Sequence, residues 1–418
     1  MRVCHALVFG LVSASAVYAQ TLPQPAACAN FASVKTGSDA DCDAAIAKEA
    51  DPAAKSVLLY RRAYMIIDRN DFNTYPKALA DLDEAIRLNP ANWKALHERA
   101  YLYNEYGRWA DALKDIDAQI ELFPRAFDGY QERAMSRFNL GDLQGSYEDR
   151  DTVVLLRPGV AAPLIGRAAA RMWLGEFDAA RADLDAAAAI AQRAGDKQTE
   201  QDIAAERAEL TLLTKTSGAT HPGKVCEDAF NASDFSREGL IGDCTLAFLQ
   251  AKTPKDKADI LTFRATARLI IAQDENAAIP DRKIAAALVP EDPDMLANLG
   301  FSYVAVHHSR AAIEEFDRSI ALKEEFFNYA GRASAKLNLN DIDGAFFDAK
   351  KSFEIKPNEL ALTVLGDCIY ARTKSYDEAK DYWIGAYKLG DRDDGLIARL
   401  KDAGVPIPPP DPETPPKR

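Results

Sequence analysis

Two neighbouring stretches decide the fold: residues 93–124 read WKALHERAYLYNEYGRWADALKDIDAQIELFP, and residues 127–158 read FDGYQERAMSRFNLGDLQGSYEDRDTVVLLRP. Three kinds of residue recur here at a 34-residue period: Ala100, Ala134 and Ala168; Gly107, Gly141 and Gly175; Pro90, Pro124 and Pro158. A small residue in a first helix, a glycine at a turn and a proline after a second helix predict a helix-turn-helix repeat. We therefore expect an all-α helical solenoid.

The period and these positions resemble the tetratricopeptide repeat (TPR) family, in its exported bacterial type. The resemblance implies a right-handed superhelix of antiparallel helix pairs, whose first helices line a concave groove that holds extended peptides or helices. Clear repeats begin at Trp93, Phe127 and Ala161, and an earlier repeat ends at Pro90. Stacked repeats bury their shared apolar face only in series, so an array of about four repeats is long enough to be stable.

The same plan starts again in the second half of the chain. Cys42 precedes Arg62 by 20 residues, and Cys244 precedes Arg264 by the same distance. This shared register predicts a duplication, and we expect two consecutive arrays. The second copy is looser, because Pro280 falls inside an expected second helix and His307 and Asn340 stand where the turn glycine would be.

The expected organisation has five parts. These are a signal peptide at 1–19, a disulfide-tied TPR array with a capping helix at 20–213, a linker at 214–224, a second disulfide-tied array with a capping helix at 225–403, and a Pro-rich tail at 404–418. The tail, with its many prolines, is expected to be extended rather than helical.

The first residues predict export. Arg2 precedes an apolar run over 3–12, and Val17 and Ala19 occupy the positions that a signal peptidase reads, so cleavage before Gln20 is expected. An uncleaved anchor is the alternative, but the run is shorter than the roughly 20 residues that span a bilayer. We expect a periplasmic or secreted protein without membrane insertion of the mature chain.

The cysteines fit an oxidising compartment. Pairing Cys28 with Cys42 and Cys226 with Cys244 would close two short loops, each worth about 3 kcal/mol if the geometry permits. Other pairings stay open. Cys368 lies on an expected first helix, where a buried free thiol or an intermolecular disulfide are the two alternatives.

Net charge and motifs exclude several classes of function. A formal charge of −13 disfavours nucleic acid and anionic membranes as partners, because both require a basic surface. The sequence has no phosphate loop, dinucleotide glycine motif, nucleophile elbow or zinc-protease helix. His307 and His308 are far in sequence from the other histidines, and a metal site needs three or four ligands. We expect no catalytic residues, metal or cofactor.

One recurring pair looks chemical. An Arg precedes the small residue of the first helix and an Asp follows 16 residues later, as in Arg99 and Asp115 or Arg133 and Asp149. A catalytic site needs one unusual constellation, so a pair present in nearly every repeat predicts a structural link between its two helices. Asp-x-Asp doublets such as Asp115 and Asp117 point about 200° apart on a helix and are expected on a solvated face.

The groove that the resemblance implies has varied side chains. The groove positions carried over from the family are Lys94, His97, Tyr101, Asn104, Glu105, Asp128, Gln131, Met135, Phe138, Asn139, Ala162, Ile165, Ala169, Met172 and Trp173. Aromatic, Met and amide side chains grip a peptide by packing and hydrogen bonds. The alternative is that Phe138, Met172 and Trp173 pack only against neighbouring repeats. No run of Lys or Arg occupies these positions, which departs from the basic clamp of chaperone-binding TPR proteins.

Three hypotheses for the function follow. The first is a non-catalytic adaptor that binds a protein or peptide outside the cytoplasm. The second is an envelope component that assembles with itself through its outer faces, caps or tail. The third, an enzyme or small-ligand binder at the junction of the two arrays, is motivated only by the concavity that joined superhelices create.

Overall fold

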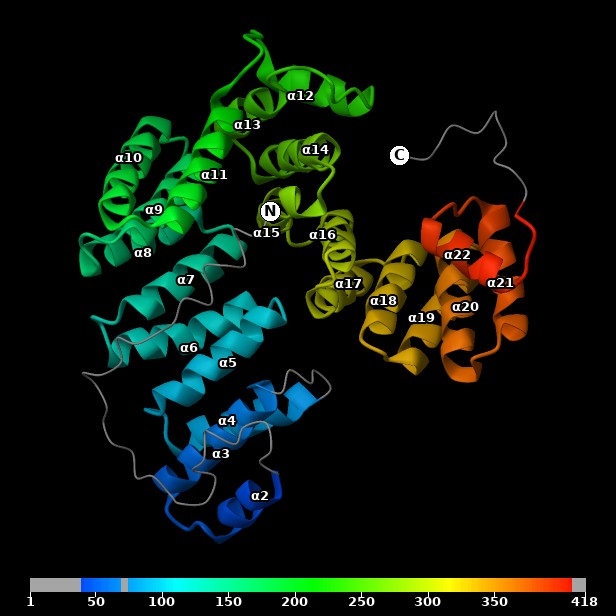
Figure 1. Ribbon diagram of the computed structural model, residues 1–418, viewed down its shortest axis with the longest axis horizontal. Coiled ribbons are helices and arrows are strands. Elements are labelled where there is room, and N and C mark those ends of the chain that lie inside the picture. Colours follow the sequence, from blue (N-terminus) through cyan, green and yellow to red (C-terminus); the bar gives the residue numbers. More distant parts are fainter. Residues whose placement is uncertain (1–38, 69–73, 408–418) are drawn as a thin grey trace. The chain divides into compact units, whose positions relative to one another are not determined.

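The computed structural model describes residues 39–68 and 74–407, and their regular secondary structure is entirely helical (Figure 1). Helix pairs follow one another along the chain, which confirms the predicted all-α, TPR-like solenoid. The chain forms two compact units, unit 1 over Met1–Ala251 and unit 2 over Lys252–Arg418. The expected signal peptide at 1–19 lies outside the described residues, as do Cys28 and residues 408–418 of the expected tail.

The described part of unit 1 begins with α2 and continues with helix pairs. Its helices are α2 (Asp39–Lys48), α3 (Pro52–Asp68), α4 (Tyr75–Leu88), α5 (Trp93–Glu105), α6 (Trp109–Leu122), α7 (Phe127–Asn139), α8 (Leu143–Leu156), α9 (Ala161–Leu174), α10 (Phe177–Ala194), α11 (Lys197–Thr214), α12 (Pro222–Asn231) and α13 (Leu240–Gln250). Helix α13 contacts α11, so α12 and α13 belong to the same compact unit as the first array. The expected array limits around 214–224 remain a prediction.

Unit 2 contains the later pairs. Its helices are α14 (Pro254–Ala272), the short 3-10 helix η3 (Glu275–Ala277), α15 (Ile279–Leu288), α16 (Pro293–Ala305), α17 (Ser309–Leu322), α18 (Phe326–Asn338), α19 (Ile342–Ile355), α20 (Glu359–Thr373), α21 (Tyr376–Leu389) and α22 (Asp394–Asp402). Pro280 was expected inside a second helix, but α15 begins at Ile279 and Pro280 lies in its first turn. A proline fits there because the first backbone N–H groups of a helix need no partner within it.

The turns follow from the recurring glycines. Gly107, Gly141 and Gly175 all have a positive φ, between 73° and 78°, which lets the first helix end and the chain reverse. His307 and Asn340 replace this glycine in unit 2 and adopt the same left-handed region, each at φ 61°. The turn geometry is therefore retained where the glycine is lost.

Small residues let the helices of a pair pack closely. Ala100, Ala134, Ala168 and Ala333 are completely buried. Gly331 of α18 lies against the ring of Phe316, which is itself fully buried on α17, and a β-carbon at position 331 would overlap that ring. Close approach of these helices therefore depends on small residues both at the recurring position and at Gly331.

A chain of hydrogen bonds through an Asn and a Ser side chain recurs between neighbouring repeats of unit 2. Asn328 donates from Nδ2 to Ser319 Oγ at 2.8 Å, and that hydroxyl donates to the carbonyl of Pro293 at 2.8 Å. Asn358 and Ser352 repeat this arrangement one repeat later. These buried hydrogen bonds cross from one helix pair to the preceding pair, so they help to fix how the two pairs stack.

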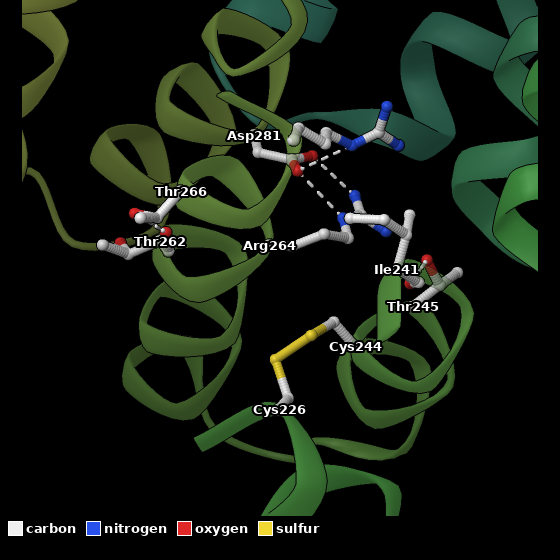
Figure 2. Close-up of a disulfide and its surroundings, with 9 residues drawn as sticks. Cys226, Ile241, Cys244, Thr245, Thr262, Arg264, Thr266 and Asp281 are labelled. Carbon is white, nitrogen blue, oxygen red and sulfur yellow. Dashed lines mark hydrogen bonds and ion pairs between the residues drawn. A yellow bond between two sulfur atoms is a disulfide. The ribbon is translucent and has the colours of Figure 1, made fainter. Parts of the chain in front are cut away.

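The cysteines of unit 1 include one described disulfide. Cys226 of α12 and Cys244 of α13 are joined, the pairing expected from the sequence (Figure 2). Cys42 is buried in the core of α2 to α5. In unit 2, Cys368 is a buried free thiol, one of the two alternatives that the sequence left open.

Candidate functional site

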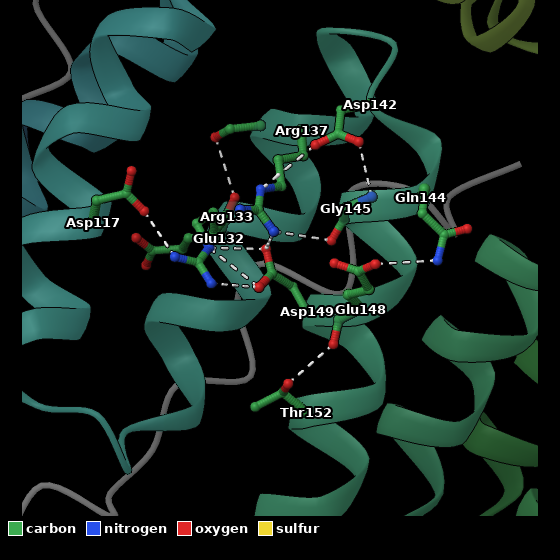
Figure 3. Close-up of polar contacts among 11 residues, drawn as sticks. Asp117, Glu132, Arg133, Arg137, Asp142, Gln144, Gly145, Glu148, Asp149 and Thr152 are labelled. Atoms are coloured by element: carbon green, nitrogen blue, oxygen red, sulfur yellow. Dashed lines mark hydrogen bonds and ion pairs between the residues drawn. The ribbon is translucent and has the colours of Figure 1, made fainter.

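The recurring Arg lies in a three-residue ion pair that we call a rung. Arg133 of α7 donates from Nη2 to Asp149 Oδ1 of α8 at 2.7 Å and from Nε to Asp149 Oδ2 at 3.0 Å (Figure 3). Its Nη1 donates to Asp117 Oδ1 of the preceding second helix at 2.8 Å. Each rung therefore joins the two helices of one repeat and also the preceding repeat.

The same rung occurs in other repeats of both units. Its members are Arg62 with Asp81 and Asp43, Arg99 with Asp115 and Asp83, Arg167 with Asp183 and Asp151, and Arg332 with Asp348 and Asp317. The predicted link at 16-residue spacing is confirmed. Hydrogen bonding to these carboxylates raises the pKa of Arg133, so its charge is held at any pH of interest.

The rungs correct the expectation for the Asp-x-Asp doublets. We expected both carboxylates on a solvated face, but the first of each doublet is buried, with only 3% of the Asp149 side chain exposed. The second is half-exposed and binds the Arg of the following repeat, as Asp117 does. The doublet arises because one helix must present a carboxylate to its own repeat and another to the next.

The candidate binding surface is the inner face of unit 1, which we define as the face of α5, α7 and α9 with the predicted groove residues. Among the first helices of unit 1, α3 contacts α5 and α9 contacts α11. Such contacts are expected where first helices line the inner side of a curved stack. Lys94, His97, Tyr101 and Glu105 recur at three- and four-residue spacing, so they lie on one side of α5.

The predicted groove residues differ in their exposure. Lys94, Glu105, Gln131 and Met135 are exposed, and His97, Tyr101, Asn104, Phe138 and Trp173 are half-buried. Asn139 and Met172 are buried, and Asn139 donates to the carbonyl of Met135 at 2.9 Å. The side chains of Asn139 and Met172 therefore support the surface from beneath.

Two aromatic residues of the predicted groove pack against neighbouring aromatic rings. Phe138 and Trp173 meet edge to face with ring centroids 5.3 Å apart, and Trp173 meets Phe248 of α13 at 6.2 Å. This contact matches the alternative that Phe138 and Trp173 pack between neighbouring helices. Both residues are nevertheless only half-buried.

Two polar contacts join α5 and α7 on the inner face. His97 Nδ1 lies 3.2 Å from Glu132 Oε1, and Ser136 Oγ lies 3.2 Å from Asn104 Oδ1. Burial alone would lower the pKa of His97, but the hydrogen bond to Glu132 and the charges of Glu132, Glu98 and Asp128 outweigh it and raise this pKa to about 9. His97 is therefore a cation at neutral pH.

Two of the three acidic side chains beside His97, Glu98 and Glu132, were missed by the sequence analysis, which included only Asp128. Burial raises the pKa of Glu98 and also that of Asp128, and Glu132 adds to both shifts. Glu98 and Glu132 share the sixth position of their first helices, one residue before the rung Arg, which is the signal that could have identified them. The middle of the inner face is therefore acidic around a single histidine.

The described residues provide no group of three or more His, Cys, Asp or Glu side chains that could hold a metal ion. Within 39–68 and 74–407, none of the helices has the length and apolar character that crossing a bilayer would require.

Comparisons with known proteins return helical-repeat structures. No family model matches the sequence, and no curated protein matches it. Among solved structures, the TPR domain of P58(IPK) is 16% identical with a TM-score of 0.27, covering 75% of this chain and 98% of that chain. A tetratricopeptide repeat protein from Parabacteroides merdae is 14% identical with a TM-score of 0.31, covering 84% and 98%. The Cut9–Hcn1 hetero-tetramer of APC/C is 16% identical with a TM-score of 0.34, covering 89% of this chain and 68% of that chain.

TM-scores this low do not bear on the function of the chain. The assignment of the chain as a TPR-like solenoid rests on its own helix pairs, turns and rungs.

Proposed function

We propose that the protein is a non-catalytic scaffold that binds a protein or peptide segment on the inner face of unit 1. The observation that carries this proposal is a contrast within the same repeats. The rung residues are nearly identical from repeat to repeat, whereas equivalent inner-face positions change, as at Tyr101, Met135 and Ala169. Variation on a fixed frame is what recognition of one particular partner requires.

The chemistry of the exposed groups supports a peptide-like ligand. Lys94 and Gln131 offer hydrogen-bond donors, and Gln131 also offers an acceptor for a backbone N–H. Met135 offers a flexible apolar surface that adapts to different side chains, and Tyr101 adds an aromatic ring with a polar tip. Such a mixture fits an extended segment better than a small apolar molecule.

We also propose that the protein acts outside the cytoplasm, in the periplasm or after secretion. The disulfide between Cys226 and Cys244 supports this location, because disulfides persist in oxidising compartments. The apolar run of the first residues supports it from the sequence.

Crosslinking capture tests the proposal. The mature chain from Gln20 would be used to capture proteins from an envelope extract of its source cell, and each enriched protein would be purified and titrated against the chain. A variant with Lys94→Ala, Gln131→Ala and Met135→Ala should weaken binding at least about 10-fold, because it removes exposed contact groups of the face.

The control changes the same three kinds of side chain on second helices. Lys114→Ala, Gln144→Ala and Leu155→Ala are all exposed on α6 and α8, and should leave the affinity unchanged. Binding that is lost in the control set and retained in the inner-face set would refute the proposal. Concentration-dependent self-association of the chain, without any captured partner, would instead favour the self-assembling envelope component.

A further inference from the structure

One helix pair of unit 2 departs from the rung. Helices α16 and α17 match α18 and α19 in length, at an offset of 33 residues. At that offset Leu299 stands where α18 has Arg332, and Glu315 stands where α19 has Asp348. Leu299 and Glu315 are each only 3% exposed. The carboxyl group of this repeat is thus buried without the Arg that a regular first helix supplies.

The preceding repeat departs in the same place. A rung Arg also binds the second carboxylate of the preceding doublet, as Arg332 binds Asp317. Before α16 the corresponding doublet begins at Asp281, which is bound by Arg264 (Figure 2), and its second position is Lys283. Here Lys283 stands in place of the preceding carboxylate, Leu299 stands in place of the Arg, and the buried acid is Glu315. We call these three residues the exchanged rung.

The titratable groups around Glu315 come from three helices. On α17, Arg318 Nη1 lies 2.7 Å from Glu315 Oε2, but the Arg318 side chain is 43% exposed, and Glu314 adds a like charge. On α15, Lys283 acts on Glu315 through charge, with its ammonium 5.6 Å from the ring centre of Tyr303. On α16 the phenol of Tyr303 is buried, and burial raises its pKa, so it is uncharged.

Helix α18 also packs against α17, but its rung Arg does not pair with Glu315. Arg332 is bound to Asp348 and Asp317. Burial raises the pKa of Glu315 to about 7, although Arg318 and Lys283 lower it. Burial without a rung Arg thus favours the protonated carboxyl more strongly than at an exposed Glu, against the opposing effect of Arg318.

We propose that the exchanged rung makes the α16–α17 helix pair a pH-sensitive joint in unit 2, closed while the carboxyl of Glu315 is protonated and loosened when it ionises. A group whose pKa rises on folding stabilises the folded state fully below its unfolded value of about 4.3, and this stabilisation is lost as the pH rises through about 7. The regular rungs differ, because each buried carboxylate is bound by an Arg whose own pKa is raised, as for Arg133 and Arg332. The inference is independent of what the inner face of unit 1 binds.

Hydrogen exchange of the full chain tests the joint. Amide protection of α16 and α17, corrected for intrinsic exchange rates, should fall up to about 100-fold between pH 5 and pH 8. Amides of α3 and α4, which are held by the Arg62 rung, provide an internal reference that should not change. Glu315→Gln, which is neutral at every pH, should make the protection of α16 and α17 independent of pH.

Two further variants make the test specific. Glu354→Gln removes a carboxylate from the exposed side of α19 and should follow the native protein. Leu299→Arg should restore a partner and abolish the fall in protection. If Leu299→Arg does not fold, carbon-13 titration of the Glu315 carboxyl in the native chain decides the question. Titration near pH 4.5, or a fall in protection that persists in Glu315→Gln, would overturn the proposal.

Discussion

At the scale of single residues, the rung explains why Arg recurs before the small position of the first helix. The guanidinium of Arg133 is planar and reaches both oxygens of Asp149 while its third nitrogen reaches Asp117. A lysine has one charged centre and cannot make these three contacts together. Asp149 receives a further cation from Arg137, at 2.9 Å, so the buried carboxylate is well compensated.

Arg133→Ala should lower the free energy of unfolding by about 2 kcal/mol. Removing one partner of a buried ion pair leaves a buried charge, which costs roughly 3–5 kcal/mol, and the remaining contact with Arg137 reduces that loss. Urea unfolding monitored by circular dichroism gives the measurement.

The control for this change is Arg181→Ala on α10. Arg181 pairs with Asp178, whose side chain is completely exposed, so no measurable loss is expected. Equal losses in the two variants would show that the rung does not stabilise the fold more than an ordinary surface pair.

At the scale of helices, successive first helices of unit 1 are joined by side chains of the inner face itself. The contact of His97 with Glu132 links α5 to α7 at the middle of that face. For the ligand that we propose, we expect binding to depend on the spacing of these two helices, because such a ligand would contact both α5 and α7.

The His97 contact should make stability depend on pH. The pKa of His97 is raised on folding to about 9, so its stabilising contribution is complete below about pH 6.5 and is lost as the pH rises through about 9. Because a third of the side chain is exposed, solvent screening reduces the expected loss to about 1 kcal/mol.

Urea unfolding between pH 6.5 and pH 9.5 measures this loss as the difference between the native chain and His97→Gln. His221→Gln changes an exposed histidine and serves as control. A native chain that follows His97→Gln over the whole range would contradict the assignment of a charged His97 to this contact.

Close packing between helices of unit 2 should be most sensitive at Gly331. A β-carbon there would overlap the Phe316 ring, so Gly331→Ala should destabilise the protein by about 2–3 kcal/mol through overpacking. Gly223 on α12 meets only ordinary contacts, and Gly223→Ala should be neutral or slightly stabilising. Calorimetric Tm values of the two variants test this, and an unchanged Tm for Gly331→Ala would show that α17 and α18 can separate at little cost.

For the whole molecule, the sequence alone predicts the succession of helix pairs and the Arg–Asp link within each regular repeat. The 34-residue period predicted the helix pairs, because Pro90 and Gly107 fix where one helix can end and the next can begin. The link of Arg133 with Asp149 also follows from the period, since residues 16 apart face each other across one helix pair.

Other features could not be predicted because they depend on how one repeat sits on the next. The bond from Arg133 to Asp117 crosses a repeat boundary, so no spacing within one repeat reveals it. Burial of Asn139 and Met172 depends on the same stacking, which turns a groove position inward. The burial of Glu315 without a rung Arg was not predicted for a different reason. Glu315 stands at the position of the rung Asp, and only a comparison of the repeats shows that Leu299 stands at the position of its Arg.

Two sets of residues have separate roles in this protein: the inner face of unit 1 is proposed to bind, and the rungs stabilise the helix pairs. The most direct test measures affinity for a purified captured partner, together with Tm, for the inner-face variant Lys94→Ala, Gln131→Ala, Met135→Ala and for Arg133→Ala. We predict that the first variant loses affinity at least about 10-fold at unchanged Tm, and that the second loses Tm at unchanged affinity. The reverse pattern, with affinity lost only in Arg133→Ala, would contradict the account.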